Sequence, residues 1–252
     1  MARGEGPYDE RAFFVLSLPA MSTEAFHVAF AEPHPFGFLV GIALPAGRAL
    51  VPETVLSRLE AREATLARAL TGFGQVRWVG GRLAAQTAGR HFGALGWCAL
   101  VGPEGAPMPP LGYSLSVAHK HDLAIALVSD AANDRLGVDL EDDVKAAREI
   151  EGVFLSREER NALDSLPSGE RDRALLLAFA LKEATYKAFA TCIGRALGYH
   201  EARVSVSPAG ELSLAATFDR VSRQPVLEAV HQWRGERVIA AVRESRPQRG
   251  GC

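Results

Sequence analysis

The chain has 252 residues, of which 48% are hydrophobic and 23% are charged. A chain of this length buries roughly three quarters of its unfolded surface, which is enough for one large domain or two small halves. Its formal net charge of −2 argues against a polyanionic partner such as a nucleic acid. An anionic ligand would therefore be small and held by a local cluster of basic groups.

Cysteine usage and the N-terminal residues bear on where the protein works. The three cysteines, Cys98, Cys192 and Cys252, cannot all pair and lack metal-ligand spacing. This pattern favours reduced thiols in a cytoplasmic protein. The apolar run at 12–18 is short and follows acidic residues, so we do not expect a signal peptide. No stretch approaches the length of a membrane span.

In the first half of the chain, hydrophobic spacing predicts strands around two helices. The first 35 residues are expected to form an arm or edge strand. A Pro- and Gly-rich loop is expected at 102–112. The predicted elements are a strand at 36–44, helices at 53–70 and 81–91, and strands at 97–101, 113–117 and 123–129.

The second half repeats this order of elements. Ser156, with Glu159 three residues later, forms a capping box that predicts a helix start. The remaining predicted elements are a strand at 136–140, a helix at 170–192 and strands at 203–207, 211–217, 226–233 and 237–242. The repeated order predicts two halves, 1–133 and 134–243, with a cleft between them. Residues 244–252 are expected to form a disordered tail.

The predicted helix at 170–192 contains an unusual group of charges, Lys182, Glu183 and Lys187. Glu183 and Lys187 are four residues apart, so they share one face and can touch the same small group. A solvated surface pair would show the same spacing. However, only four of the 28 basic residues are lysines, and two of those four lie here. Because the protonation of lysine can be tuned and that of arginine cannot, this choice indicates chemistry.

A second candidate site is the strand that reads Gly-Val-Asp-Leu-Glu. Its alternation places Asp139 and Glu141 on one face. Adjacent carboxylates repel each other, so such a pair belongs either at a solvated strand edge or around a cation. Taken alone, the pair fits the solvated edge better. Together with Glu183 it predicts an oxygen site for Mg²⁺. Asp142 and Asp143, which follow, are interpreted as solvated loop charges.

Basic groups in the first half are candidates for holding phosphate. His119 and the rare Lys120 end a predicted strand, while His121 is expected only to cap the turn. Arg77 and Arg82 flank a Gly-Gly pair at a predicted helix N-terminus, where free N–H groups favour an anion. Two ordinary surface arginines would give the same pattern. The first half thus holds the candidate anion ligands, and the second half holds the candidate metal ligands.

The sequence resembles the 4′-phosphopantetheinyl transferases, most closely the monomeric type that activates enterobactin synthase and surfactin synthase. The matching stretches are 81–85, 116–119, 137–141 and 179–188. The specific signal is the pair of motifs G-[IV]-D-x-E and K-E-x-x-x-K at the family's separation. The resemblance implies an α/β (α+β) fold of two pseudo-symmetric halves. Each half would be a small antiparallel sheet with helices packed on it, with the active site in the cleft between them.

The resemblance also implies the reaction. The 4′-phosphopantetheine arm would pass from coenzyme A to a serine of an apo acyl or peptidyl carrier protein, releasing adenosine 3′,5′-bisphosphate. The carrier would serve siderophore, polyketide or nonribosomal peptide biosynthesis. Two alternatives remain open, a metal-dependent hydrolase of the coenzyme A pyrophosphate and a non-catalytic module that binds carrier proteins.

Roles for individual residues follow from the same resemblance. Asp139, Glu141 and Glu183 would hold Mg²⁺. Glu183 would also draw the proton from the carrier serine. Lys187 would stabilise or protonate the leaving phosphate, and Lys182 would lie close to the phosphates.

The resemblance implies a separate group of ligands for the 3′-phosphate of coenzyme A. His119 would bind it together with Arg82 and Arg77. Ala118 stands where the family usually has a hydroxyl residue, and Lys120 would compensate for the missing contact.

Overall fold

The computed structural model describes residues 26–47, 50–102, 105–193, 198–206, 212–216 and 225–244, without the side chains of 191–193, 206 and 212. Residues 1–25, the expected tail at 245–252, and the side chains of Cys192 and Cys252 therefore lie outside the described part. Cys98 is a half-buried free thiol. Among the described residues, no helix combines the length and the apolar character needed to cross a membrane.

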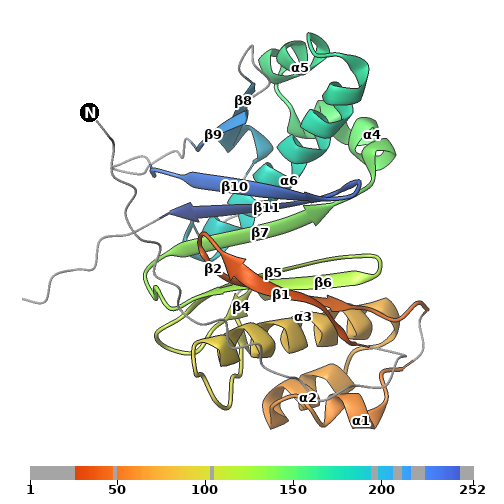
Figure 1. Ribbon diagram of the computed structural model, residues 1–252, viewed down its shortest axis with the longest axis vertical. Coiled ribbons are helices and arrows are strands. Elements are labelled where there is room, and N and C mark those ends of the chain that lie inside the picture. Colours follow the sequence, from red (N-terminus) through yellow and green to blue (C-terminus); the bar gives the residue numbers. More distant parts are fainter. Residues whose placement is uncertain are drawn as a thin grey trace, which may run out of the picture.

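The first half is a four-stranded antiparallel sheet with a long helix on one face (Figure 1). In order across the sheet, the strands are β1 (Val28–His34), β2 (Gly37–Ala43), β6 (Leu123–Ser129) and β5 (Ser114–Lys120). Helix α3 (Gly72–His91) packs on β2 and β6. The short helices α1 (Glu53–Leu56) and α2 (Ala61–Arg68) lie beyond it. A small hairpin pairs β3 (Leu100–Val101) with β4 (Pro107–Met108).

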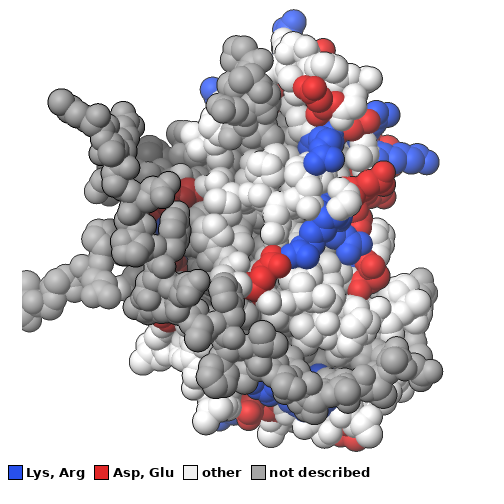
Figure 2. Space-filling view, in the orientation of Figure 1, with Lys and Arg blue, Asp and Glu red and all other residues white. Residues whose placement is uncertain are grey.

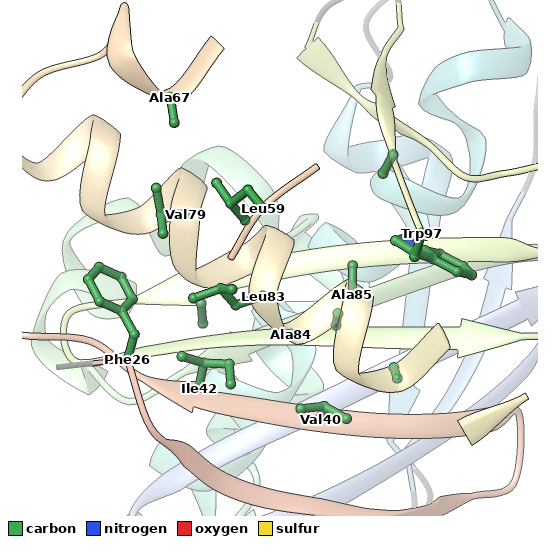
Figure 3. Close-up of a cluster of buried hydrophobic side chains, with 14 of the residues drawn as sticks. Phe26, Val40, Ile42, Leu59, Ala67, Val79, Leu83, Ala84, Ala85 and Trp97 are labelled. Atoms are coloured by element: carbon green, nitrogen blue, oxygen red, sulfur yellow. The ribbon is translucent and has the colours of Figure 1, made fainter. Parts of the chain in front are cut away.

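The core of the first half lies between α3 and the sheet. Figure 3 shows Leu83 of α3 beside Ile42 of β2, and Val79 and Val40 belong to the same buried cluster. Close packing depends on a glycine in the middle of α3, because a Cβ at Gly81 would lie 2.7 Å from Val117 Cγ1. The helix therefore rests directly on the sheet.

The second half is a three-stranded antiparallel sheet covered by the longest described helix. The strands are β10 (Glu228–Arg234), β11 (Arg237–Glu244) and β7 (Arg135–Glu141). Helix α6 (Ser168–Ile193) packs on β7 and β11. The remaining elements are α4 (Val144–Phe154), α5 (Arg157–Asp164), a 3₁₀ turn (Tyr199–Glu201) and the hairpin of β8 (Ala202–Val206) and β9 (Leu212–Ala216).

The two halves meet through their sheets, with α3 and α6 on the outer faces (Figure 1). Leu39 and Leu127 of the first sheet pack with Leu140 of the second in one buried cluster. The Val138 N–H also donates a 2.9 Å hydrogen bond to Ser116 Oγ. The predicted α/β class, with small antiparallel sheets and helices packed on them, is confirmed. The proposed division between residues 133 and 134 falls in the loop between β6 and β7.

Several predicted boundaries were wrong. The helix expected at 53–70 is two short helices, α1 and α2. The helix expected to start at residue 81 begins at Gly72. Four glycines in its first ten residues weaken the local signal, and packing on the sheet overrides that low propensity. The strand expected at 97–101 is reduced to β3.

Helix α4 was not predicted, and it gives structural roles to Asp142 and Asp143, which were interpreted as solvated loop charges. Asp143 is its N-cap, because its side chain accepts a 2.9 Å hydrogen bond from Ala146 N. Asp142 forms a 2.6 Å ion pair with Arg237. Neither is a free loop charge. Glu244, expected in the tail, is the last residue of β11.

The contact between α6 and β7 depends on Gly137. A Cβ at this position would overlap Ala184 O and lie 3.0 Å from Ala188 N. Both of these atoms belong to the backbone of α6, so no side-chain rotation can relieve the clash. Gly137 thus permits the helix backbone to approach the acidic strand.

We expect Gly137→Ala to lower the free energy of unfolding by about 1 to 3 kcal/mol, because the helix must move away from the strand. Urea-induced unfolding followed by circular dichroism measures the change. Gly152→Ala is the matched control, since a Cβ at this exposed α4 position meets no atom within 4 Å. The control should raise stability by roughly 0.5 to 1 kcal/mol. Equal effects of the two substitutions would contradict the close-approach argument.

Candidate active site

The acidic strand and the Lys-Glu helix meet, as their motifs predict. Lys187 Nζ of α6 lies 2.6 Å from Asp139 Oδ1 of β7 and donates a second hydrogen bond to Val138 O at 3.2 Å. Asp139 is buried, and its Oδ2 has no hydrogen-bond partner. Burial raises the pKa of Asp139, while the charge of Lys187 opposes the rise. A cation beside Oδ2 would satisfy this atom.

Glu141 lies two residues further along β7 and is also buried. Lys120 of β5 forms an ion pair with its carboxylate. Burial, together with repulsion from Asp139, raises the pKa of Glu141 to about 7, although Lys120 opposes the rise. Lys120, predicted as a phosphate ligand, therefore balances a carboxylate of the other half in this structure. Its reach to a phosphate stays a prediction.

Glu183 is held by a residue that the sequence did not indicate. The Tyr199 hydroxyl donates a 2.6 Å hydrogen bond to Glu183 Oε1. Burial, and then the carboxylate of Glu183, holds the pKa of Tyr199 above its ordinary value. Asp139 and Glu141 act on the same hydroxyl in the same direction. The three predicted metal ligands thus surround one region, and Tyr199 keeps its proton there.

The donor set fits a hard cation such as Mg²⁺. Asp139 offers an unpartnered oxygen, and burial of the negative charges of Asp139 and Glu141 favours a neutralising ion. Within the described residues, no three His, Cys, Asp or Glu side chains already converge as metal ligands. Lys187, Lys120 and Tyr199 instead hold one carboxylate each. A cation would bind the carboxylate oxygens that these partners leave open, Asp139 Oδ2 among them.

Basic groups gather on the first half beside Lys187. His119 lies at the exposed edge of β5. Desolvation lowers its pKa most, and the positive charges of Lys187 and Arg77 lower it further. Arg77 Nε is buried without a hydrogen-bond partner, and its guanidinium lies 5.7 Å from the Phe73 ring centroid. The positive charges of Lys187 and Arg77 beside His119 favour a bound anion, and an anion there would in turn favour the protonated imidazole.

The argument that placed Arg77 and Arg82 at a helix N-terminus is wrong. Helix α3 starts at Gly72, so both arginines lie within the helix and its dipole provides no anion site there. Arg82 is 5% exposed, lies 3.8 Å from Glu63 Oε1 and stacks over the Trp78 ring at 4.7 Å. These contacts place Arg82 in the core of the first half. Its Nε, like that of Arg77, has no hydrogen-bond partner in the described part, and its contact with a phosphate stays a prediction.

Lys182 lies in the core of the second half, and its predicted place beside the phosphates stays a prediction. Its side chain is fully buried and lies 2.8 Å from Glu159 Oε1. Its ammonium group donates further hydrogen bonds to Tyr199 O at 3.1 Å and Ala202 O at 2.7 Å. The physical reason is rotation about the helix, because Lys182 and its neighbour Glu183 point about 100° apart. Lys182 therefore faces the core.

An open cavity of about 610 Å³ lies between the halves. Leu115 and Val117 of β5 line one side, while Lys187 and Tyr186 of α6 line the other. The β4 residues Pro107 and Met108 contribute to the same cavity. The cleft that the repeated element order predicted therefore exists, and Lys187 faces it. On the face shown in Figure 2, basic and acidic side chains lie next to one another.

Comparisons with known proteins cover mainly the second half. Residues 135–242 match the 4′-phosphopantetheinyl transferase superfamily. This region contains β7 and α6, and with them Asp139, Glu141, Glu183 and Lys187. No curated protein matches the sequence.

Similar solved structures include three synthases. An apo-ACPS from Chronobacterium ammoiniagenes is 20% identical, with 45% of this chain and 98% of that chain covered at a TM-score of 0.36. A holo-(acyl-carrier-protein) synthase from Bacillus anthracis in complex with CoA (3′,5′-ADP) is 20% identical. The match covers 43% of this chain and 93% of that chain at a TM-score of 0.35. The Helicobacter pylori holo-[acyl-carrier-protein] synthase in complex with coenzyme A is 21% identical. The match covers 42% of this chain and 96% of that chain at a TM-score of 0.33.

The raised pKa of Glu141 can be tested through the pH dependence of protein stability. Its folded pKa of about 7 exceeds the ordinary value of 4.5, so its favourable contribution is complete below about pH 4.5 and is lost as pH rises through 7. Glu141→Gln cannot titrate. Between pH 4.5 and 7, we expect the free energy of unfolding of the metal-free wild type to fall by roughly 2 to 3 kcal/mol relative to that of this variant. Urea-induced unfolding of both proteins in the presence of a chelator measures this change. A difference in unfolding free energy that does not vary with pH would contradict the raised pKa of Glu141.

Proposed function

We propose that this protein transfers the 4′-phosphopantetheine arm of coenzyme A to a serine of an apo carrier protein in a Mg²⁺-dependent reaction. The observation that carries the proposal is the contact of α6 with β7. It brings Lys187 to Asp139 and leaves Glu141 and Glu183 in the same buried, acidic region. The superfamily match over residues 135–242 includes both elements.

The metal ligands in this proposal are Asp139, Glu141 and Glu183. When bound, Mg²⁺ would neutralise the pyrophosphate charge and polarise its oxygens. Glu183 would accept the serine hydroxyl proton as the serine oxygen bonds to the β-phosphorus of coenzyme A. The bond from that phosphorus to the bridging oxygen then breaks, and adenosine 3′,5′-bisphosphate leaves.

Lys187 would stabilise the charge that develops on the leaving phosphate. Its ammonium faces the cavity and already lies next to the acidic strand. A compact ammonium beside phosphate oxygens supplies a charge-assisted hydrogen bond and can give up a proton. This position suits both stabilisation and proton donation.

His119 and Arg77, whose charges interact with each other and with Lys187, would hold the 3′-phosphate of coenzyme A. The unpartnered Nε of Arg77 and the surrounding positive charge at His119 support this role. Arg82 and Lys182 are left out of this group, because both are directed into the cores of their halves.

We further propose that the protein is a monomer of the type that activates enterobactin synthase and surfactin synthase. One chain already provides two sheet-and-helix halves and a cleft between them. The acyl or peptidyl carrier protein is its second substrate. The cytoplasm, where apo carriers are made, is the proposed location.

The direct test is mass spectrometry of apo carrier proteins after incubation with the protein, coenzyme A and Mg²⁺. Carriers of fatty-acid, polyketide and nonribosomal-peptide synthesis should be tested in parallel. The proposal predicts one added phosphopantetheine on the carrier serine and equal amounts of adenosine 3′,5′-bisphosphate. Hydrolysis of coenzyme A without carrier modification would identify a hydrolase instead. Carrier binding without turnover would identify a non-catalytic module.

His119→Ala should weaken binding of coenzyme A much more than binding of dephospho-coenzyme A. A charge-assisted contact to phosphate contributes about 1.5 to 3 kcal/mol, so discrimination between the ligands should shrink roughly tenfold to a hundredfold. Calorimetric titration of both ligands measures this ratio. Equal losses for the two ligands would show that His119 contacts another part of coenzyme A.

Lys187→Arg should keep the fold and most of the coenzyme A affinity but lose about tenfold to a thousandfold in turnover. A guanidinium is planar, longer and unable to release its proton, so it cannot replace the ammonium beside Asp139. Initial rates of carrier modification measure the loss. Lys145→Arg is the control, because Lys145 is exposed on α4. Wild-type rates in both variants would exclude the proposed role of Lys187.

A further inference from the structure

The turn that carries Tyr199 is fixed by its own hydrogen bonds. Gly198 N donates to Glu201 Oε2 at 2.8 Å, and Glu201 N donates to Gly198 O at 3.0 Å. The backbone therefore enters the 3₁₀ turn in a defined conformation. This matters because Tyr199 is the only described side chain that donates a hydrogen bond to Glu183.

Lys182 fastens the same turn to the core of the second half. Its ammonium reaches the carbonyl oxygens of Tyr199 and Ala202, at 3.1 and 2.7 Å, and the Glu159 carboxylate. An ammonium has three protons, so all of its donors are used. Lys182 thus links helix α6 to the two ends of the turn.

Glu159 forms an ion pair with Lys182 and also accepts two backbone hydrogen bonds. It accepts a 2.7 Å hydrogen bond from Ser156 N in the capping box and a 2.8 Å hydrogen bond from Val204 N of β8. Lys182 lowers the pKa of Glu159 against the effect of burial, so the carboxylate stays charged. The network therefore connects α5, α6, β8 and the turn.

Aromatic packing then directs the Tyr199 hydroxyl. The ring lies 6.2 Å from the Phe154 ring and 6.3 Å from the Phe179 ring, measured between centroids. With its backbone held by Lys182 and its ring held by two phenyl groups, Tyr199 has little freedom. Its hydroxyl reaches one oxygen of Glu183 and leaves the other oxygen for a ligand.

We infer that Tyr199 is a positioning residue for Glu183, and that Lys182 acts on Glu183 through Tyr199 rather than through a phosphate. The inference rests on the proposed function, in which Glu183 is both metal ligand and base. It explains why a buried lysine directly precedes that glutamate. Hydrogen bonds of this kind orient a metal-binding carboxylate, and their removal costs roughly tenfold to a hundredfold in metal affinity or activity.

The first test is Tyr199→Phe, which keeps the ring and removes only the hydroxyl. We expect kcat to fall about tenfold to a hundredfold and Mg²⁺ affinity, measured by calorimetry without coenzyme A, to fall about tenfold. The KM for coenzyme A should change less than about twofold, because Tyr199 is not among the proposed ligands of the 3′-phosphate. Thr185→Val is the control, since among the described residues the buried Thr185 hydroxyl donates just one hydrogen bond, back to Leu181 O on the same helix.

The second test asks whether Lys182 acts through Tyr199. Replacing the pair together, Lys182→Met with Glu159→Gln, avoids leaving one buried charge without a partner. This pair variant should lose kcat and Mg²⁺ affinity as Tyr199→Phe does. Combined with Tyr199→Phe, it should cause little further loss, because both changes remove the same orientation of Glu183. Multiplicative losses would overturn the link between Lys182 and Tyr199.

The outcomes separate this inference from the proposed function. Transfer by wild type, with unchanged kcat and Mg²⁺ affinity in Tyr199→Phe, would overturn the positioning role alone. If wild type binds Mg²⁺ without transferring the arm, a loss of affinity in Tyr199→Phe would still support positioning. Absence of both transfer and Mg²⁺ binding in wild type would overturn both proposals.

Discussion

The close approach of helix α6 to strand β7 is the constraint on which the rest of the site depends. Gly137 has no side chain, so the backbone at Ala184 and Ala188 can lie directly against the strand. This approach places Lys187 within 2.6 Å of Asp139, two residues along the strand. A side chain at 137 would separate the two motifs, and the acidic strand would then lose its lysine.

The site combines charges that would be costly to bury one by one. The buried Asp139 and Glu141 and the half-buried Glu183 each have a proton donor beside them, namely Lys187, Lys120 and Tyr199 in that order. Lys120 comes from the first half, so the acidic strand is balanced partly from across the cleft. The arrangement keeps negative charge concentrated on one face of β7, next to Lys187, which lines the cavity. A small cation is the ligand that such a face favours most.

Much of this site could be predicted from the sequence because side-chain periodicity fixes faces. Alternation along a strand puts Asp139 and Glu141 together, and four-residue spacing on a helix puts Glu183 and Lys187 together. The capping box at Ser156 was also visible and is confirmed. The role of Lys182 was not predictable, since the 199–202 turn that it fastens comes many residues later. The start of α3 was missed because tertiary packing, not local propensity, makes its glycine-rich first turns helical.

The most direct test of the account is a crystal structure of the protein with coenzyme A and Mn²⁺, whose anomalous signal locates the metal. The account predicts one ion coordinated by oxygens of Asp139, Glu141 and Glu183, with Lys187 next to the pyrophosphate. It also predicts that Tyr199 remains bonded to Glu183 and that Lys182 stays on the turn. A metal bound away from β7, or a pyrophosphate that lies out of reach of Lys187, would contradict it.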